Sequence, residues 1–163
     1  MKNGLSGLFG LALLSSLVTL IAATQNAPVW KTHVGTWKVN LAKSKYSPAS
    51  AAPKSATVTN EPVGDGFKAV VDAVDSTGRA IHSEYTYRFD GKDVPVPGDP
   101  SRDMTSVRKI DDFTFEQINK KNGKVTTTSR CVYAKDGKSR TFTTTGITPQ
   151  GQVVNNVVVY DRQ

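Results

Sequence analysis

Apolar and polar residues alternate with a period of two along most of the chain after residue 34. In the stretch 35–41, for example, Trp37, Val39 and Leu41 share one face, and polar residues occupy the positions between them. Such alternation is typical of a β-strand with one face in a core. It recurs along the chain and predicts strands at 35–41, 56–63, 67–75, 80–89, 104–110, 113–120, 124–134, 139–146 and 152–161.

Short turn sequences separate these strands. They are Gly64-Asp65-Gly66, Ser76-Thr77-Gly78, Asp90-Gly91, Asn122-Gly123, Asp136-Gly137 and Pro149-Gln150-Gly151. Asn-Gly and Asp-Gly favour tight hairpins because both residues tolerate a positive φ. Consecutive hairpins predict an all-β fold, an antiparallel up-and-down meander. Because the edges of an open sheet pair readily with other chains, we expect the meander to close as a barrel, with a two-sheet β-sandwich as the alternative.

The N-terminal residues follow a different pattern. Lys2 precedes an uncharged stretch from Leu5 to Ala23, which is rich in Leu, Ala and Gly and ends in small residues. This order is typical of a secretory signal peptide. We expect cleavage after Ala23, with Ala27 as the alternative site. An uncleaved membrane anchor is the other interpretation of the same stretch.

The composition changes at the same point. Seven Leu residues precede residue 24 and only Leu41 follows it, whereas 18 Val and 17 Thr lie after Ala23 and favour strands. The predicted organisation is a signal peptide at 1–23, an N-terminal tether without periodicity at 24–34, and a single β-barrel domain at 35–163. A signal peptide predicts a periplasmic or secreted protein, with no stable membrane span after cleavage.

Charge and cysteine content exclude some classes of function. The net charge is +7 at pH 7, but the basic residues are scattered singly and form no stripe with interleaved aromatic residues. We therefore expect no nucleic-acid partner. Cys131 is the only cysteine, so no internal disulfide can form, and its place in a predicted strand favours a buried, unreactive thiol.

Several segments carry a resemblance to known barrels. Gly35-Thr36-Trp37 is similar to the Gly-x-Trp that opens the lipocalin barrel, although paired cysteines and a middle lipocalin signature are missing. Residues 35–46, 89–100 and 155–161 resemble a group of small exported bacterial lipocalin-like β-barrel proteins. The resemblance implies a lipocalin-like barrel that is exported, and it implies no reaction. It also implies that Arg162, near the C-terminus, packs over Trp37 and closes the barrel structurally.

One predicted strand carries candidate chemistry. His82 and Glu84 lie two residues apart, so they share a face with Arg88. If that face points into the barrel, it could bind a polar head group or serve acid–base chemistry. The opposite face is aromatic, with Tyr85, Tyr87 and Phe89, and looks more like a core; in that interpretation His82 and Arg88 face solvent.

Two further arginines lie within predicted strands. Arg108 and Arg130 could each clamp a ligand carboxylate if they point inward, and are ordinary surface charges if they point outward. The stretch from Phe89 to Asp103 contains three prolines and no alternation, so it is expected either to rim the barrel mouth or to form a rigid connection.

The predicted function is binding of a small apolar or amphipathic ligand inside the barrel. An envelope protein-interaction module with a filled barrel is one alternative, and a barrel enzyme using His82 and Glu84 is another. No nucleophile motif or phosphate-binding glycine loop is present, so no catalytic residue and no cofactor are assigned. A metal site is not expected, because His33, the only other histidine, lies in the tether. We expect a monomer.

Overall fold

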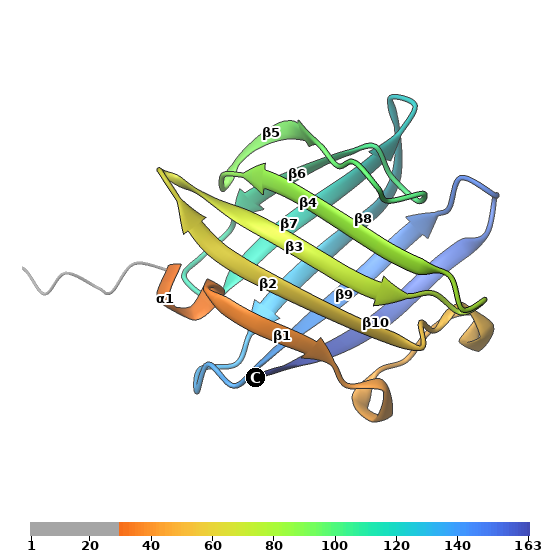
Figure 1. Cartoon of the computed structure of the whole chain (residues 1–163), viewed down its shortest axis with the longest axis horizontal. Helices are drawn as coiled ribbons and strands as arrows, with labels where there is room; N and C mark the ends of the chain where they lie inside the picture. Colours follow the sequence, from red (N-terminus) through yellow and green to blue (C-terminus); the bar gives the residue numbers. More distant parts are fainter. Residues whose placement is uncertain (1–29) are drawn as a thin grey trace, which may run out of the picture.

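The fold is a meander of ten antiparallel strands that forms a nearly closed barrel (Figure 1). It is seen in a computed structural model that describes residues 30–163. A four-residue helix, α1 (Trp30–His33), precedes the strands, and two 3-10 turns, η1 (Leu41–Lys43) and η2 (Ala49–Ala51), follow the first strand. The strands are β1 (Gly35–Val39), β2 (Ser55–Val63), β3 (Gly66–Val74), β4 (Ala80–Tyr87), β5 (Asp90–Pro95), β6 (Met104–Lys109), β7 (Thr114–Lys121), β8 (Lys124–Tyr133), β9 (Ser139–Ile147) and β10 (Val153–Arg162).

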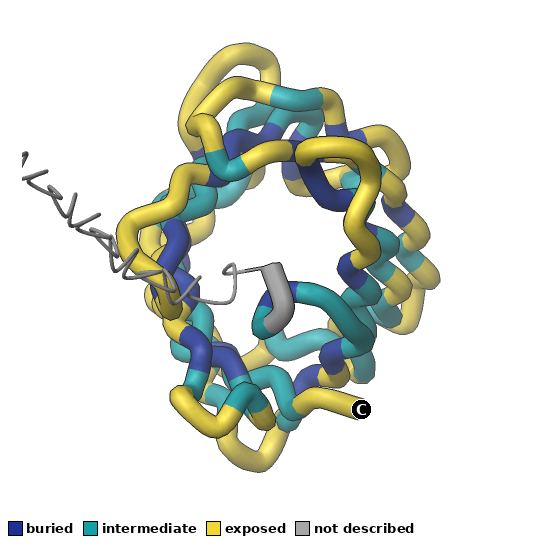
Figure 2. Tube along the Cα trace, turned by 90° about the vertical axis from the view of Figure 1, so that its left-hand side faces the viewer, coloured by how far each residue is buried: buried dark blue, intermediate teal, exposed yellow. Residues whose placement is uncertain are grey.

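Pairing of the first and last strands makes the sheet into a barrel. The strand order is β4-β3-β2-β1-β10-β9-β8-β7-β6-β5, and β1 pairs with β10 so that Trp37 lies opposite Arg162. One sheet therefore contains all ten strands, which confirms the predicted up-and-down barrel over the two-sheet sandwich. Figure 2, which looks from the α1 end, shows the strands as a ring with the chain just after α1 inside it.

The remaining gap, between β4 and β5, is covered by the segment that follows β5. The Ser83 hydroxyl donates a 2.7 Å hydrogen bond to the carbonyl of Pro97. Gly98, at φ +81, approaches the β4 backbone so closely that an added Cβ would lie 2.2 Å from the His82 carbonyl oxygen. Only a glycine fits both this conformation and this spacing.

Two parts of the chain differ from the sequence prediction. The stretch 89–103 was expected to lack strands, yet it contains β5, whose alternation is hidden by a register shift between Asp90 and Asp93 and by the prolines. The tether expected at 24–34 is not a free connection over its described part, because His33 is buried and Val34 packs against the core. The signal peptide at 1–23 lies outside the described residues.

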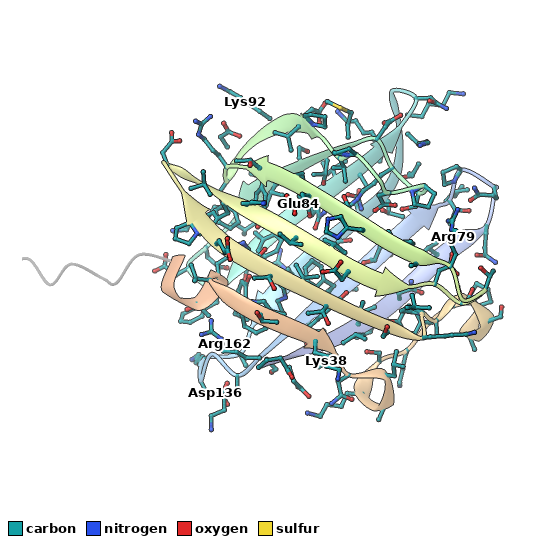
Figure 3. The ribbon with its side chains drawn as sticks, viewed as in Figure 1. Lys38, Arg79, Glu84, Lys92, Asp136 and Arg162 are labelled. Atoms are coloured by element: carbon teal, nitrogen blue, oxygen red, sulfur yellow. The ribbon has the colours of Figure 1, made fainter. Side chains whose placement is uncertain are left out.

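The core lies along the inner face of the barrel and is densest near α1. Its main cluster is mostly aromatic and comprises Trp37, Phe67, Ala69, Tyr87, Val107, Phe115, Cys131 and Tyr133. On β4 the aromatic face points inward and the face with His82 and Glu84 points outward, as the aromatic interpretation predicted. Figure 3 shows Glu84 on the outer side of β4.

The close approach of Gly98 yields a stability test. Gly98→Ala should destabilise the fold by the cost of a non-glycine residue at positive φ, about 1–2 kcal/mol, plus about 1–3 kcal/mol for the clash with the β4 backbone. Gly151→Ala is the matched control, because Gly151 has φ +80 and nothing within 4 Å of an added Cβ. Urea unfolding of both variants measures the difference, and equal losses would mean that the segment does not press against β4.

Candidate functional site

A cavity of about 260 Å³ lies inside the barrel. It extends from His33, the last residue of α1, to Tyr46 and Pro53, which belong to the connection between β1 and β2. Its walls combine valine and aromatic side chains with amides, a threonine and two arginines. The lining residues are His33, Tyr46, Pro53, Val58, Asn60, Val71, Tyr85, Tyr87, Arg102, Val107, Phe115, Gln117, Asn119, Arg140, Phe142, Thr144, Val158 and Tyr160.

The two ends of this cavity differ. Figure 1 shows α1 at one end of the barrel and the turns η1 and η2 at the other. Pro53, at the η2 end, also lines a second hollow of about 580 Å³ among the loops that include Ser76, Pro100 and Gln150. The η2 end therefore holds a vestibule next to the cavity, whereas the α1 end is filled by His33.

His33 is held by tyrosines from opposite parts of the barrel. Its Nδ1 is hydrogen-bonded to the Tyr133 hydroxyl and its Nε2 to the Tyr87 hydroxyl. A neutral imidazole has one N–H donor and one acceptor nitrogen, so one hydroxyl accepts and the other donates. The His33 carbonyl accepts hydrogen bonds from Trp37 Nε1 at 3.2 Å and from Asn60 Nδ2 at 3.3 Å. These bonds fold the chain before β1 back into the barrel.

Trp37 lies beneath two guanidinium groups. Arg162 Cζ is 4.8 Å from the centre of the indole, and Arg140 Cζ is also 4.8 Å from it. The contact between Arg162 and Trp37 that the lipocalin resemblance implied is therefore present. Arg162 Nη2 also donates 2.7 Å hydrogen bonds to the carbonyls of Thr32 and Val34, so the same side chain fixes the segment around α1 (Figure 3).

Arg140 is a buried positive charge without a negative partner in the part of the chain that the structure describes. Its residue is only 3% exposed, and no carboxylate among residues 30–163 lies within ion-pair distance of it. Its Nη1 donates one long hydrogen bond, 3.4 Å, to the Tyr133 hydroxyl, and its Nε has no hydrogen-bond partner. The rings of Phe142 and Tyr160 lie 5.3 and 5.2 Å from its Cζ. Because arginine stays protonated in proteins, these contacts leave a full charge at the cavity wall.

Arg102 is buried but neutralised. Its Nε donates a 2.9 Å hydrogen bond to Asp99, and both side chains are largely shielded from solvent. Its Nη1 donates to Asn119 Oδ1 at 2.8 Å, and the same amide oxygen accepts a bond from the Thr105 hydroxyl. Arg102 therefore belongs to a satisfied network, which sets it apart from Arg140.

The remaining interior groups are neutral near pH 7. Burial, followed by the charge of Arg140, holds the pKa of His33 well below its usual 6.5. Burial raises the pKa of Cys131 to about 12 and raises those of Tyr87 and Tyr133. The Cys131 thiol is therefore a poor nucleophile, as expected for a buried strand cysteine.

The site residues expected from the sequence lie outside the cavity. His82 pairs with Asp72 at 2.7 Å on the outer face. Ion pairs on the same outer surface join Lys68 to Glu84, Arg88 to Asp65 and Arg108 to Glu116, and Arg130 is exposed. None of the five residues His82, Glu84, Arg88, Arg108 and Arg130 lines the cavity. These residues could bind a ligand inside the barrel only if their side chains pointed inward. Their side chains point outward, so that prediction is wrong.

The basic residues that do line the cavity, His33, Arg102 and Arg140, were not predicted from the sequence as ligand-binding residues. Arg140 alternates with Phe142 and Thr144 on the inner face of β9, so its position next to an aromatic residue was the one available signal. His33 and Arg102 lie outside the strands and carry no periodic signal. Among residues 30–163, no group of three metal-ligating side chains could hold a metal ion. Within the same range, no helix has the length and apolar composition of a membrane span.

The buried imidazole predicts how stability depends on pH. The pKa of His33 is lowered in the folded state, so protonation favours the unfolded chain as the pH falls below about 6.5. Stability should fall between pH 7 and 5 by at most about 1.4 kcal/mol per pH unit from this group. The neighbouring Tyr87, Tyr133 and Arg140 titrate above this range.

His33→Gln should flatten this dependence in urea unfolding experiments. His82 changes the pH dependence of stability in the opposite direction to His33, because its hydrogen bond to Asp72 raises its pKa. The stability that His82 contributes is present at low pH and is lost as the pH rises through its folded pKa, so His82→Gln should steepen the fall toward pH 5. An unchanged slope in His33→Gln would contradict the burial of a neutral His33.

No family model matches the chain, and no curated protein matches it.

Proposed function

We propose that this protein is an exported binding protein that holds a small amphipathic ligand inside its barrel. The observation that supports the proposal is the cavity, whose lining combines Val58, Val71 and Phe142 with amides and an uncompensated arginine. Binding sites for small molecules are typically concave and largely apolar, with a few polar groups that fix orientation. Export is inferred from the sequence of residues 1–23 alone.

The cavity volume gives the scale of a ligand that would fit inside the barrel. Water occupies about 30 Å³ per molecule in the liquid, so 260 Å³ corresponds to a ligand on the order of ten non-hydrogen atoms. The η2 end supports access from solvent, because Pro53 lines both the cavity and the vestibule.

The two alternatives have less support. A filled barrel acting only through its loops does not require a cavity with polar groups in its wall. An enzyme using His82 and Glu84 would act on the outer surface, where both side chains are about half exposed and engaged with Asp72 and Lys68.

A cavity-filling substitution tests the proposed function. Val71 lines the cavity, whereas Val70 is next to it on the outer face of β3. Octanamide, which has about ten non-hydrogen atoms, should bind the wild type with a Kd on the order of 0.1–1 mM. Val71→Phe should weaken this binding at least about tenfold because the ring occupies the space, and Val70→Phe should leave it unchanged.

Titration calorimetry and the NMR signals of the valine methyl groups measure this binding. Native mass spectrometry of protein purified from its own host provides an independent readout, a bound small molecule that survives purification. Equal affinity in both variants would place the probe outside the barrel. The proposal would be overturned by the absence of both octanamide binding and any co-purified molecule.

A further inference from the structure

Among residues 30–163, the side chains that line the cavity carry one net positive charge near pH 7. The described lining residues include no Asp or Glu, and Arg102 is neutralised by Asp99. His33 is neutral near pH 7 because of its burial. Arg140 is thus the one lining charge of residues 30–163 that lacks a counter-charge. A buried ion costs several kcal/mol of stability unless a partner compensates it.

We propose that the ligand is a small monocarboxylate whose carboxylate binds the guanidinium of Arg140. This inference rests on the proposed function and names the chemical class of its ligand. A single uncompensated charge matches a monoanion, whereas a phosphate dianion would leave one negative charge buried without a partner. The planar guanidinium presents parallel N–H donors that fit a carboxylate in bidentate geometry.

The geometry around Arg140 leaves donors for such a ligand. The Tyr133 hydroxyl is its only hydrogen-bond acceptor among residues 30–163, at 3.4 Å. Trp37 and Phe142 pack against the guanidinium and fix its plane, so little conformational entropy is lost when a carboxylate binds.

The position of Arg140 also orients the rest of the ligand. Arg140 pairs with Tyr160 in the sheet and bonds to Tyr133, which holds His33, so it lies toward the α1 end. The valines Val58, Val71 and Val158 also line the cavity, which reaches Pro53 at the η2 end. The apolar part of the ligand would extend along these valines toward Pro53.

A matched pair of probes tests the inference. Octanoate and octanamide have the same chain and differ in charge at one end. The wild type should bind octanoate about ten- to a hundredfold more tightly than octanamide at neutral pH, as expected for hydrogen bonds to a charged group. Arg140→Gln should reduce this preference to within about threefold. Arg130→Gln, which removes an exposed charge from the adjacent strand β8, should preserve it.

An NMR readout on the wild type does not depend on the folding of the Arg140 variant. The ¹⁵Nε–¹Hε signal of Arg140 should shift when octanoate binds and remain in place with octanamide. Equal binding of both probes in the wild type would overturn the carboxylate assignment and leave the proposed function intact. Binding of neither probe would overturn the carboxylate assignment, and together with the absence of any co-purified molecule it would overturn the proposed function as well. If Arg130→Gln abolished the preference for octanoate and Arg140→Gln retained it, the preference would arise from surface charge. That result would overturn the inference.

Discussion

The packing of two arginine guanidinium groups against the indole of Trp37 is the interaction on which the rest of the structure depends. Arg162 and Arg140 each lie 4.8 Å from the indole centre and come from the last strand and from its neighbour. Cation–π contacts of this kind are strongest when they are shielded from water, and Trp37 is fully buried. Arg162 joins the ends of the meander and fixes the segment around α1. The barrel is therefore closed at the end where His33 is inserted.

The same arrangement creates the chemical asymmetry of the interior. Packing against Trp37, Phe142 and Tyr160 stabilises the guanidinium of Arg140 without neutralising it. A protein selected for stability alone would gain from an apolar residue at such a position. The buried network of Arg102 with Asp99 and Asn119 shows that this chain can neutralise an interior arginine. The absence of such a partner for Arg140 within residues 30–163 is the observation on which the proposed carboxylate ligand rests.

Most of the fold was predictable because its signals are local. Period-two alternation and Gly-containing turns identified nine of the ten strands, and the two-residue turn Asn122-Gly123 has positive φ at both residues, as expected. The strand β5 was missed because a register shift and Pro95 interrupt its alternation.

The site was less predictable because its signals are not local. Arg130 and Arg140 both lie in alternating strands, and only the closure of the barrel decides which of them faces inward. His33 is held by Tyr87 and Tyr133, which are 54 and 100 residues away in the sequence, so no local pattern indicates its burial. Arg102 reaches the cavity from a loop whose path depends on the fit of Gly98 against β4.

A high-resolution crystal structure of the protein purified from its own host, without refolding, tests the central claim most directly. The account predicts elongated density in the cavity, with a forked end at hydrogen-bond distance from the Arg140 guanidinium and a tail along Val71 and Val158. A cavity filled by its own side chains, or an Arg140 guanidinium paired with a carboxylate of the protein, would contradict it.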